Sequence, residues 1–367
     1  EMQRSLVGSE MCIRDRNTLY AVNLYDTSKP RKYDKPYNQV TFRTAGPSAM
    51  SIPVGLDDDL SAMLLNNDVY PEVPEGTEYY LPAGSSYRVT PFALMKGFRL
   101  AGSRDGVKPI VVLEGSWSIA EGSYLSSLEF DNIEFRHEAN NNYFMNTSKA
   151  YTIENVSFVN CDFISLRRGF WRHQSANAKY IMNLEMEGCR FEGCGWQTSA
   201  YGAFNLQSFD KDNGVSYDQV DRAIFRNCTF SNDNDGTNGY GWGNLFYAPY
   251  MDKPIDLEYK NVTIYNYSRN QRLINIESAV GSKLVMEGIL LASPCGDLFA
   301  IGANTTTTFS NNYTTADYTL GGKNMNATDL KITAAELFAD PANGDLTIKD
   351  TSSPIVSNRA GDTRWLP

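Results

Sequence analysis

The chain has 367 residues, a formal net charge of −10 at pH 7 and only 21% charged residues. Because the balance is acidic and no basic stripe is present, we do not expect nucleic acid as a partner. No uninterrupted apolar run is long enough for a transmembrane helix, which needs about 18 residues or more, so none is expected.

The first segment, residues 1–16, reads EMQRSLVGSEMCIRDR. It resembles a translated sequencing-adapter read-through rather than a protein segment. Charged residues also interrupt the apolar core that a signal peptide would need. We therefore expect residues 1–16 to be non-native, and the true N-terminus with any export signal to be missing.

Residues 17–46 contain two alternating segments, 20–25 and 40–44, which predict two strands around a polar turn. The pair resembles the last two strands of a fibronectin type III domain, and two strands alone cannot bury a core. Residues 47–77 are expected to form a linker and an N-terminal cap. A short helix over 60–65, preceded by three aspartates, would cover the open end of the domain that follows.

A four-residue kernel then recurs seven times, at gaps of 27 to 39 residues. It consists of Gly or Asn, an apolar residue, any residue and a large apolar residue. Self-similarity at such a period predicts a solenoid. The kernels are Gly97–Leu100, Asn132–Phe135, Asn160–Phe163, Gly188–Phe191, Asn227–Phe230, Asn261–Ile264 and Gly288–Leu291.

The surroundings of each kernel predict three strands per turn. An alternating segment precedes the kernel, and a third short apolar segment, such as Gly169–Trp171, follows after a long loop. The Gly or Asn suits a one-residue corner with left-handed backbone. The sequence therefore predicts an all-β chain with a parallel β-helix over residues 78–318 and a capping tail over 319–367.

Three cysteines, Cys161, Cys189 and Cys228, share one kernel position. This spacing predicts an interior column of small apolar thiols, because unpaired cysteine packs well when buried. A metal or redox cluster is the alternative, although no CxxC motif or histidine accompanies them.

The segment Glu78–Gly84 follows the expected cap helix with Leu-Pro-Ala-Gly, and a Tyr and a Leu-x-Gly strand come next. This order resembles the start of pectate-lyase-like β-helices, and the ending Gly361–Pro367 resembles those of bacterial β-helix proteins tied to polysaccharide use. The resemblance implies a right-handed, single-stranded parallel β-helix of a bacterial surface family without an assigned function. It further implies a monomer at the cell surface or outside the cell, as an outer-membrane lipoprotein or in the periplasm. Its membrane contact would be only a lipid anchor on the missing N-terminus.

The resemblance also implies that the strand after the long loop forms the sugar-binding face. If Phe170, Phe204 and their equivalents point inward, alternation places polar and aromatic side chains outward, where rings stack on sugars and amides bond hydroxyls. The predicted polysaccharide-binding residues are Trp171, Asn205, Gln207, Tyr247 and Asn275, with Trp196, Tyr240 and Trp242 from the two longest loops. The alternative is that these aromatic residues merely cover the flank of the rod.

The strongest catalytic cluster in the sequence is Arg168, His173 and Glu277. A lyase needs a cation to neutralise the substrate carboxylate and a base to remove a proton. A salt-bridged edge of the rod is the alternative. The motifs of polygalacturonases and of calcium-dependent pectate lyases are missing, since the chain has only two histidines and lacks the required aspartate pairs.

One long connection carries Asp210, Asp212 and Asp218, and clustered carboxylates favour Ca²⁺. A solvated acidic loop is the alternative. Three functions are consistent with the sequence: a polysaccharide-binding module, a lyase or hydrolase acting on a pectin-like acidic polysaccharide, and a structural spacer or adhesin. Binding is the preferred hypothesis.

Overall fold

The computed structural model describes residues 19–24, 38–43, 50–69, 73–137, 143–195, 202–232, 244–267, 273–292, 299–318 and 325–367, of which 19–24, 38–43 and 66–69 are described as backbone only. The predictions on residues 1–16 and on Trp196, Tyr240 and Trp242 lie outside this range. Near the start, β1 (Leu19–Leu24) and β2 (Asn38–Arg43) pair in antiparallel fashion, so two strands form where two were predicted.

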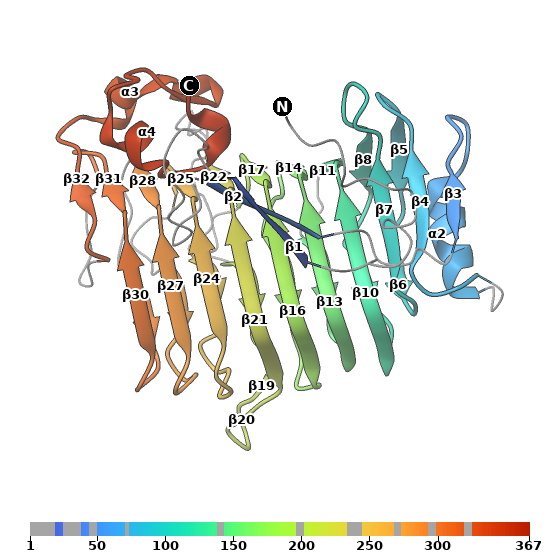
Figure 1. Ribbon diagram of the computed structural model, residues 1–367. Helices are drawn as coiled ribbons and strands as arrows, with labels where there is room; N and C mark the ends of the chain where they lie inside the picture. The colour runs from blue at the N-terminus through green and yellow to red at the C-terminus, as the bar shows by residue number, and fades with distance from the viewer. Residues whose placement is uncertain are drawn as a thin grey trace.

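The described chain is mostly β-strand, and its long sheets are parallel throughout, as predicted (Figure 1). Two sheets have 10 strands and one has 6. Sheet 1 contains β3 (Ser51–Pro53), β4 (Thr77–Leu81), β7 (Phe98–Gly102), β10 (Ser123–Asp131), β13 (Tyr151–Val159), β16 (Lys179–Glu187), β21 (Asp218–Arg226), β24 (Asp256–Lys260), β27 (Lys283–Glu287) and β30 (Thr306–Ser310).

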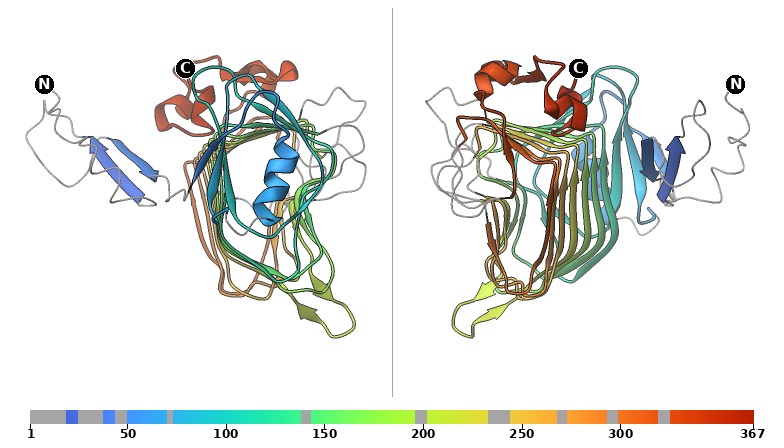
Figure 2. Two further views of the ribbon diagram at one scale, coloured as in Figure 1. Left: turned by 90° about the vertical axis from the view of Figure 1, so that its right-hand side faces the viewer. Right: turned by 60° about the vertical axis from the view of Figure 1, so that its left-hand side comes forward.

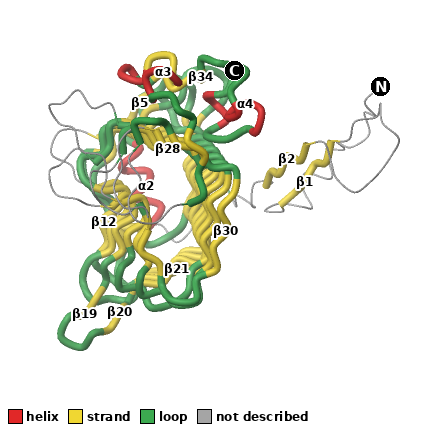
Figure 3. The backbone as a smooth tube through the Cα atoms, turned by 90° about the vertical axis from the view of Figure 1, so that its left-hand side faces the viewer, coloured by secondary structure: helices red, strands yellow, loops and turns green. Residues whose placement is uncertain are grey.

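Sheet 2 contains β5 (Ser86–Val89), β8 (Ile110–Leu113), β11 (Glu134–His137), β14 (Asp162–Ile164), β17 (Arg190–Glu192), β22 (Thr229–Ser231), β25 (Thr263–Tyr265), β28 (Leu290–Ala292), β31 (Tyr313–Thr314) and β32 (Thr328–Asp329). Sheet 3 contains β12 (Tyr143–Thr147), β15 (Gly169–His173), β18 (Gly202–Leu206), β23 (Asn244–Tyr247), β26 (Ile274–Ile276) and β29 (Phe299–Ile301). Across the middle of the rod, each turn of the chain adds one strand to every sheet, and the turns stack along one axis (Figure 3). This arrangement is consistent with a parallel β-helix.

The corners between sheets 1 and 2 behave as the kernels predict. Their first residues have positive φ, at Asn132, Asn160, Gly188, Asn227, Asn261 and Gly288. Stacked asparagines also bond, since Asn160 Nδ2 donates to Asn132 Oδ1 at 2.6 Å. The kernel beginning at Gly97 was misassigned: Leu100 pairs with Phe130, so it lies in sheet 1 ahead of the corner. A corner at Asn311 was missed.

The core between the sheets is dominated by stacked phenylalanines. Phe135, Phe163, Phe191 and Phe230 form one column, with ring centroids 5.3, 4.7 and 4.8 Å apart. Each comes from the last position of a kernel, so one sequence position per turn builds a continuous aromatic stack. The kernel cysteines are unpaired and fully buried beside it, in agreement with an interior column of thiols.

Helix α2 (Leu60–Val69) lies across the opening at the N-terminal end of the rod (Figure 2, left). It begins as predicted after three aspartates, and Asp59 Oδ1 accepts a hydrogen bond from the Ala62 amide at 3.0 Å. Leu60 and Leu64 are buried against the core, so this helix covers the first turn.

Three further short strand pairings and four short helices complete the described chain. These are β6 (Ala93–Leu94) with β9 (Ser118–Ile119), the hairpin β19 (Phe209–Asp210) with β20 (Val215–Ser216), β33 (Phe338–Asp340) with β34 (Asp345–Ile348), and the helices α3 (Ala334–Leu337), η1 (Pro341–Asn343), α4 (Pro354–Asn358) and η2 (Thr363–Trp365).

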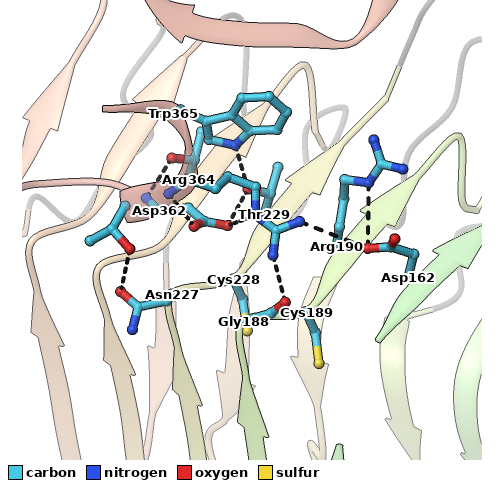
Figure 4. A network of polar contacts seen from close by, with 12 residues as sticks. Asp162, Gly188, Cys189, Arg190, Asn227, Cys228, Thr229, Asp362, Arg364 and Trp365 are labelled. Atoms are coloured by element: carbon cyan, nitrogen blue, oxygen red, sulfur yellow. Dashed lines mark hydrogen bonds and ion pairs between the residues drawn. The ribbon is translucent and has the colours of Figure 1, made fainter. Parts of the chain in front are cut away.

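The tail, which the sequence predicted as a capping segment, packs along the outer flank of sheet 2. Phe338, Leu346 and Ile355 form a second apolar cluster with Leu290 and Tyr313. Further back along the rod, Trp365 Nε1 donates to Thr229 Oγ1 at 2.7 Å, and Arg364 donates to the Gly188 carbonyl at 2.5 Å (Figure 4). The tail therefore covers the outer face of sheet 2 over several turns.

Candidate functional site

The register of sheet 3 decides which side chains face outward. Trp171 pairs with Phe204, and Arg172 pairs with Asn205. Trp171 is fully buried, and its Nε1 donates to the Tyr151 hydroxyl at 3.2 Å. The prediction that Trp171 lies on an exposed sugar-binding strip is therefore wrong.

The error has a local cause. At or just before the start of five sheet 3 strands, two consecutive residues belong to the core, for example Phe170 and Trp171, or Ala203 and Phe204. Strict alternation counted from the first of them places every later side chain of β15 on the wrong face.

On β29 the aligned outward position is Ala300. On the other five strands of sheet 3 the outward row consists of Asn146, Arg172, Asn205, Tyr247 and Asn275. Adjacent members are about 4.8 Å apart, the spacing between strands. We call this set the polar row. Three of its members, Asn205, Tyr247 and Asn275, were predicted to share a face, and their register confirms this.

The polar row is partly sheltered. Asn205 and Asn275 are only 3% and 6% exposed, whereas Asn146, Arg172 and Tyr247 are half-buried. The Arg172 guanidinium lies 5.3 Å from the centre of the Tyr143 ring, a cation–π contact that fixes its position. Asn146 Oδ1 is a buried acceptor without a hydrogen-bond partner in the described part of the chain. Gln207, two residues beyond Asn205, is half-buried.

His173 lies on the opposite side of the same strand, inside the rod. It is fully buried, and both ring nitrogens are engaged. Nδ1 lies 2.6 Å from Asp218 Oδ1, and Nε2 lies 2.5 Å from the Tyr151 hydroxyl. These contacts assign the neutral tautomer in which Nδ1–H donates to the carboxylate and Nε2 accepts from the phenol.

The hydrogen bonds continue beyond this pair. The Ser208 amide donates to Asp218 Oδ2 at 2.6 Å, and the Lys179 ammonium donates to Ser208 Oγ at 2.7 Å. Lys179 also donates to the carbonyls of Ser175 and Asn177. Lys179 and Asp218 are register neighbours on β16 and β21, so a buried positive and negative charge lie on adjacent turns. We call Tyr151, His173, Lys179, Ser208 and Asp218 the interior network.

Burial governs the titration of this network. It lowers the pKa of His173, although the neighbouring Asp218 opposes the shift. Burial alone would raise the pKa of Asp218, but the interactions with His173 and the Ser208 amide outweigh it, and the pKa is lowered. Burial also lowers the pKa of Lys179, to about 8. Near neutral pH, His173 is therefore neutral between an anionic Asp218 and a cationic Lys179.

We expect the folded chain to lose stability as the pH falls below about 6.5, the ordinary pKa of histidine. In the unfolded chain this histidine is then protonated, whereas buried His173 in the folded chain stays neutral. One such group lowers the free energy of unfolding by at most about 1.4 kcal/mol per pH unit. Asp218, with its lowered pKa, adds a loss in the same direction below about pH 4. Urea denaturation midpoints between pH 8 and 4 measure the effect.

The chain offers a matched pair of histidine variants for this measurement, because it has only two histidines. His173→Gln is expected to flatten the pH 5–6.5 part of the profile. His137→Gln, which changes a half-buried ring on sheet 2, is expected to keep it. Identical profiles for the two variants would contradict the assignment.

The predicted catalytic residues do not converge. Arg168 is half-buried just before β15, His173 faces the interior, and Glu277 is exposed after β26. Because β15 and β26 are separated by three strand spacings, His173 and Glu277 belong to turns about 14 Å apart. The carboxylate partner of His173 is Asp218.

Sequence reasoning missed the partners of His173, although a signal was present. Tyr151, Lys179 and Asp218 each stand two residues before an inward Ile or Val in an alternating strand. That spacing places all three on the inner face of sheet 1.

The proposed calcium ligands do not form one site. Asp210 lies in the β19–β20 hairpin and accepts from the amides of Asp212 and Asn213, whereas Asp218 points inward to His173. Asp212 is exposed. Within the described ranges, no three His, Cys, Asp or Glu residues are grouped so that they would hold a metal ion.

No family model matches the sequence, and no curated protein matches it. Among the described helices, none is long and apolar enough to cross a membrane.

Proposed function

We propose that the chain is a polysaccharide-binding β-helix of the right-handed, pectate-lyase-like kind, acting at a bacterial cell surface or outside the cell. The observation that carries the proposal is the polar row. Amides, a guanidinium and a phenol recur once per turn on one face of sheet 3. A linear polymer of hydroxyl-bearing rings lying along the rod would meet Arg172 and Tyr247, which are two strand spacings apart, and Asn146 one spacing before Arg172. Asn205 and Asn275 lie between and beyond them but are nearly covered.

Binding is favoured over catalysis by the position of His173. A general base must come within hydrogen-bond reach of the proton that it removes. His173 is fully buried, and both of its nitrogens are already bonded within the interior network. A lyase or hydrolase acting on a pectin-like acidic polysaccharide remains the second candidate, because Arg172 would pair with a uronate carboxylate.

Replacing Arg172 with alanine is expected to weaken polysaccharide binding about tenfold or more, because a hydrogen bond to a charged group contributes about 1.5–3 kcal/mol. Affinity electrophoresis of the full chain through gels containing acidic or neutral plant polysaccharides, or host polysaccharides, measures the loss. Absorbance of unsaturated uronates in the same mixtures detects a lyase.

The control is Arg136→Ala, which removes an exposed arginine that pairs with Glu134 on sheet 2. It should leave retardation unchanged. If Arg172→Ala migrates as the unaltered chain does in every gel that retards the latter, the polar row is not the binding site. If no polysaccharide retards the unaltered chain, the spacer hypothesis is favoured.

A further inference from the structure

The outer face of sheet 1 carries a second group of side chains, near the N-terminal ends of its strands. Tyr124 on β10, Thr152 on β13, Tyr180 on β16 and Gln219 on β21 pair in register. These strands lie side by side in Figure 1. The two tyrosines are thus two strand spacings apart, or about 9.6 Å, with a threonine between them. Tyr124 is 55% exposed, among the most exposed large side chains that are described.

Both phenols are held by carboxylates. The Tyr124 hydroxyl donates to Glu154, and the Tyr180 hydroxyl donates to Asp221. A third carboxylate, Glu75, accepts from the Ser126 amide at 2.6 Å and acts electrostatically on Tyr124. We call Glu75, Tyr124, Glu154, Tyr180 and Asp221 the tyrosine–carboxylate patch.

The patch has an excess of negative charge. Elsewhere on this face carboxylates are paired, as where Arg99 joins Glu78 and Glu129. In the described part of the chain, no ion pair joins a cation to Glu75, Glu154 or Asp221. The hydrogen bond to Asp221 raises the pKa of Tyr180 to about 12, so this phenol stays protonated near neutral pH.

We propose that the tyrosine–carboxylate patch binds a polysaccharide with free amino groups, lying along the rod axis across β10, β13, β16 and β21. Tyrosine rings attract cations by their faces as well as stacking on sugar rings, and unpaired carboxylates attract ammonium groups. The phenol–hydroxyl–phenol–amide order across four turns suits a repeating linear polymer. A peptide strand would instead need an unpaired sheet edge, and the patch lies on a sheet face.

The proposal shares with the proposed function only its ligand class, a polysaccharide, and it uses a different face. The described residues of the tail contact the rod at the other ends of these strands, as at Gly188 beyond β16. The two sites can therefore be tested separately in the same chain.

The test measures binding of the full chain to a glucosamine hexamer by titration calorimetry, at a slightly acidic pH at which the amino groups are protonated. The matched ligands are the N-acetylated hexamer, which is neutral, and oligolysine. We expect the glucosamine hexamer to bind at least tenfold more tightly than the N-acetylated one, and its affinity to fall with added salt. The double variant Glu154→Gln/Asp221→Asn should bind the glucosamine hexamer about tenfold more weakly.

Two variants of Tyr124 distinguish the contribution of its ring from that of its hydroxyl group. Tyr124→Ala should weaken binding about fivefold, whereas Tyr124→Phe should retain most of it because the ring face remains. Tyr80→Ala is the control, since Tyr80 is 39% exposed on the same sheet but lies outside the patch.

Equal affinity for the acetylated and free hexamers would overturn the proposal, as would unchanged binding by Tyr124→Ala and the carboxylate variant. Oligolysine binding as tightly as the glucosamine hexamer would overturn the sugar assignment. If Arg172→Ala abolishes retardation by other polysaccharides while the glucosamine hexamer does not bind, the proposed function stands and this inference fails. If the glucosamine hexamer binds while Arg172→Ala leaves retardation unchanged, the patch on sheet 1 is the sugar-binding site and the polar row is not.

Discussion

Replacing Asp218 with alanine is expected to lower the free energy of unfolding by about 3–5 kcal/mol, the usual cost of leaving a buried charge without its compensating neighbour. The substitution removes the acceptor of His173 Nδ1–H and of the Ser208 amide. It also leaves the Lys179 ammonium buried on the adjacent turn without its negative neighbour. Urea denaturation followed by far-ultraviolet circular dichroism gives the value.

The control for Asp218 is Asp212→Ala on the same connection, which changes an exposed carboxylate and should shift stability by no more than about 0.5 kcal/mol. Asp218→Asn should fall between the two, because an amide keeps one acceptor oxygen for the network. If Asp218→Ala matches Asp212→Ala, the interior network does not stabilise the fold.

The same Asp218 variant tests the function. At urea concentrations and temperatures at which it is still folded, Asp218→Ala should bind polysaccharide, because the interior network lies on the opposite side of sheet 3 from the polar row. A selective loss of sugar-dependent activity in a folded variant would instead support a catalytic role for the His173–Asp218 pair.

Replacing Phe163 with alanine is expected to cost about 3–5 kcal/mol, the range for removing a large aromatic side chain from a core. Its ring is stacked on Phe135 and Phe191, and Phe158 and Phe170 contact its edges. The cavity would lie between three consecutive turns, where rigid sheets on all sides limit collapse. Thermal or urea denaturation measures the loss.

Phe163→Leu should cost clearly less, because most of the volume remains. The neighbouring Ile164→Ala is the positional control, since that side chain is only half-buried on β14. A loss from Phe163→Ala no greater than that from Ile164→Ala would show that the aromatic column is not the main source of cohesion between turns.

The sequence alone determined the repeating plan of the rod. The kernel period predicted the stacked parallel strands, and the asparagines and glycines marked corners that do adopt positive φ, as at Asn160 and Gly188. These features are local: a corner depends on the φ of one residue, and a half-buried strand on alternation within a few positions. The start of α2 could be predicted for the same reason, because three aspartates precede an apolar run.

Only the tertiary structure decided the faces and the partners. Two consecutive core residues at the start of β15 turned Trp171 inward and Arg172 outward, because a shift of one residue exchanges the two faces of a strand. His173 and Asp218 meet across 45 residues, Tyr124 and Glu154 across 30, and Trp365 and Thr229 across 136. Such contacts depend on which residues of different turns lie next to each other, and this is set by the lengths of the loops between the strands. The alternation of residues within one strand does not give that alignment.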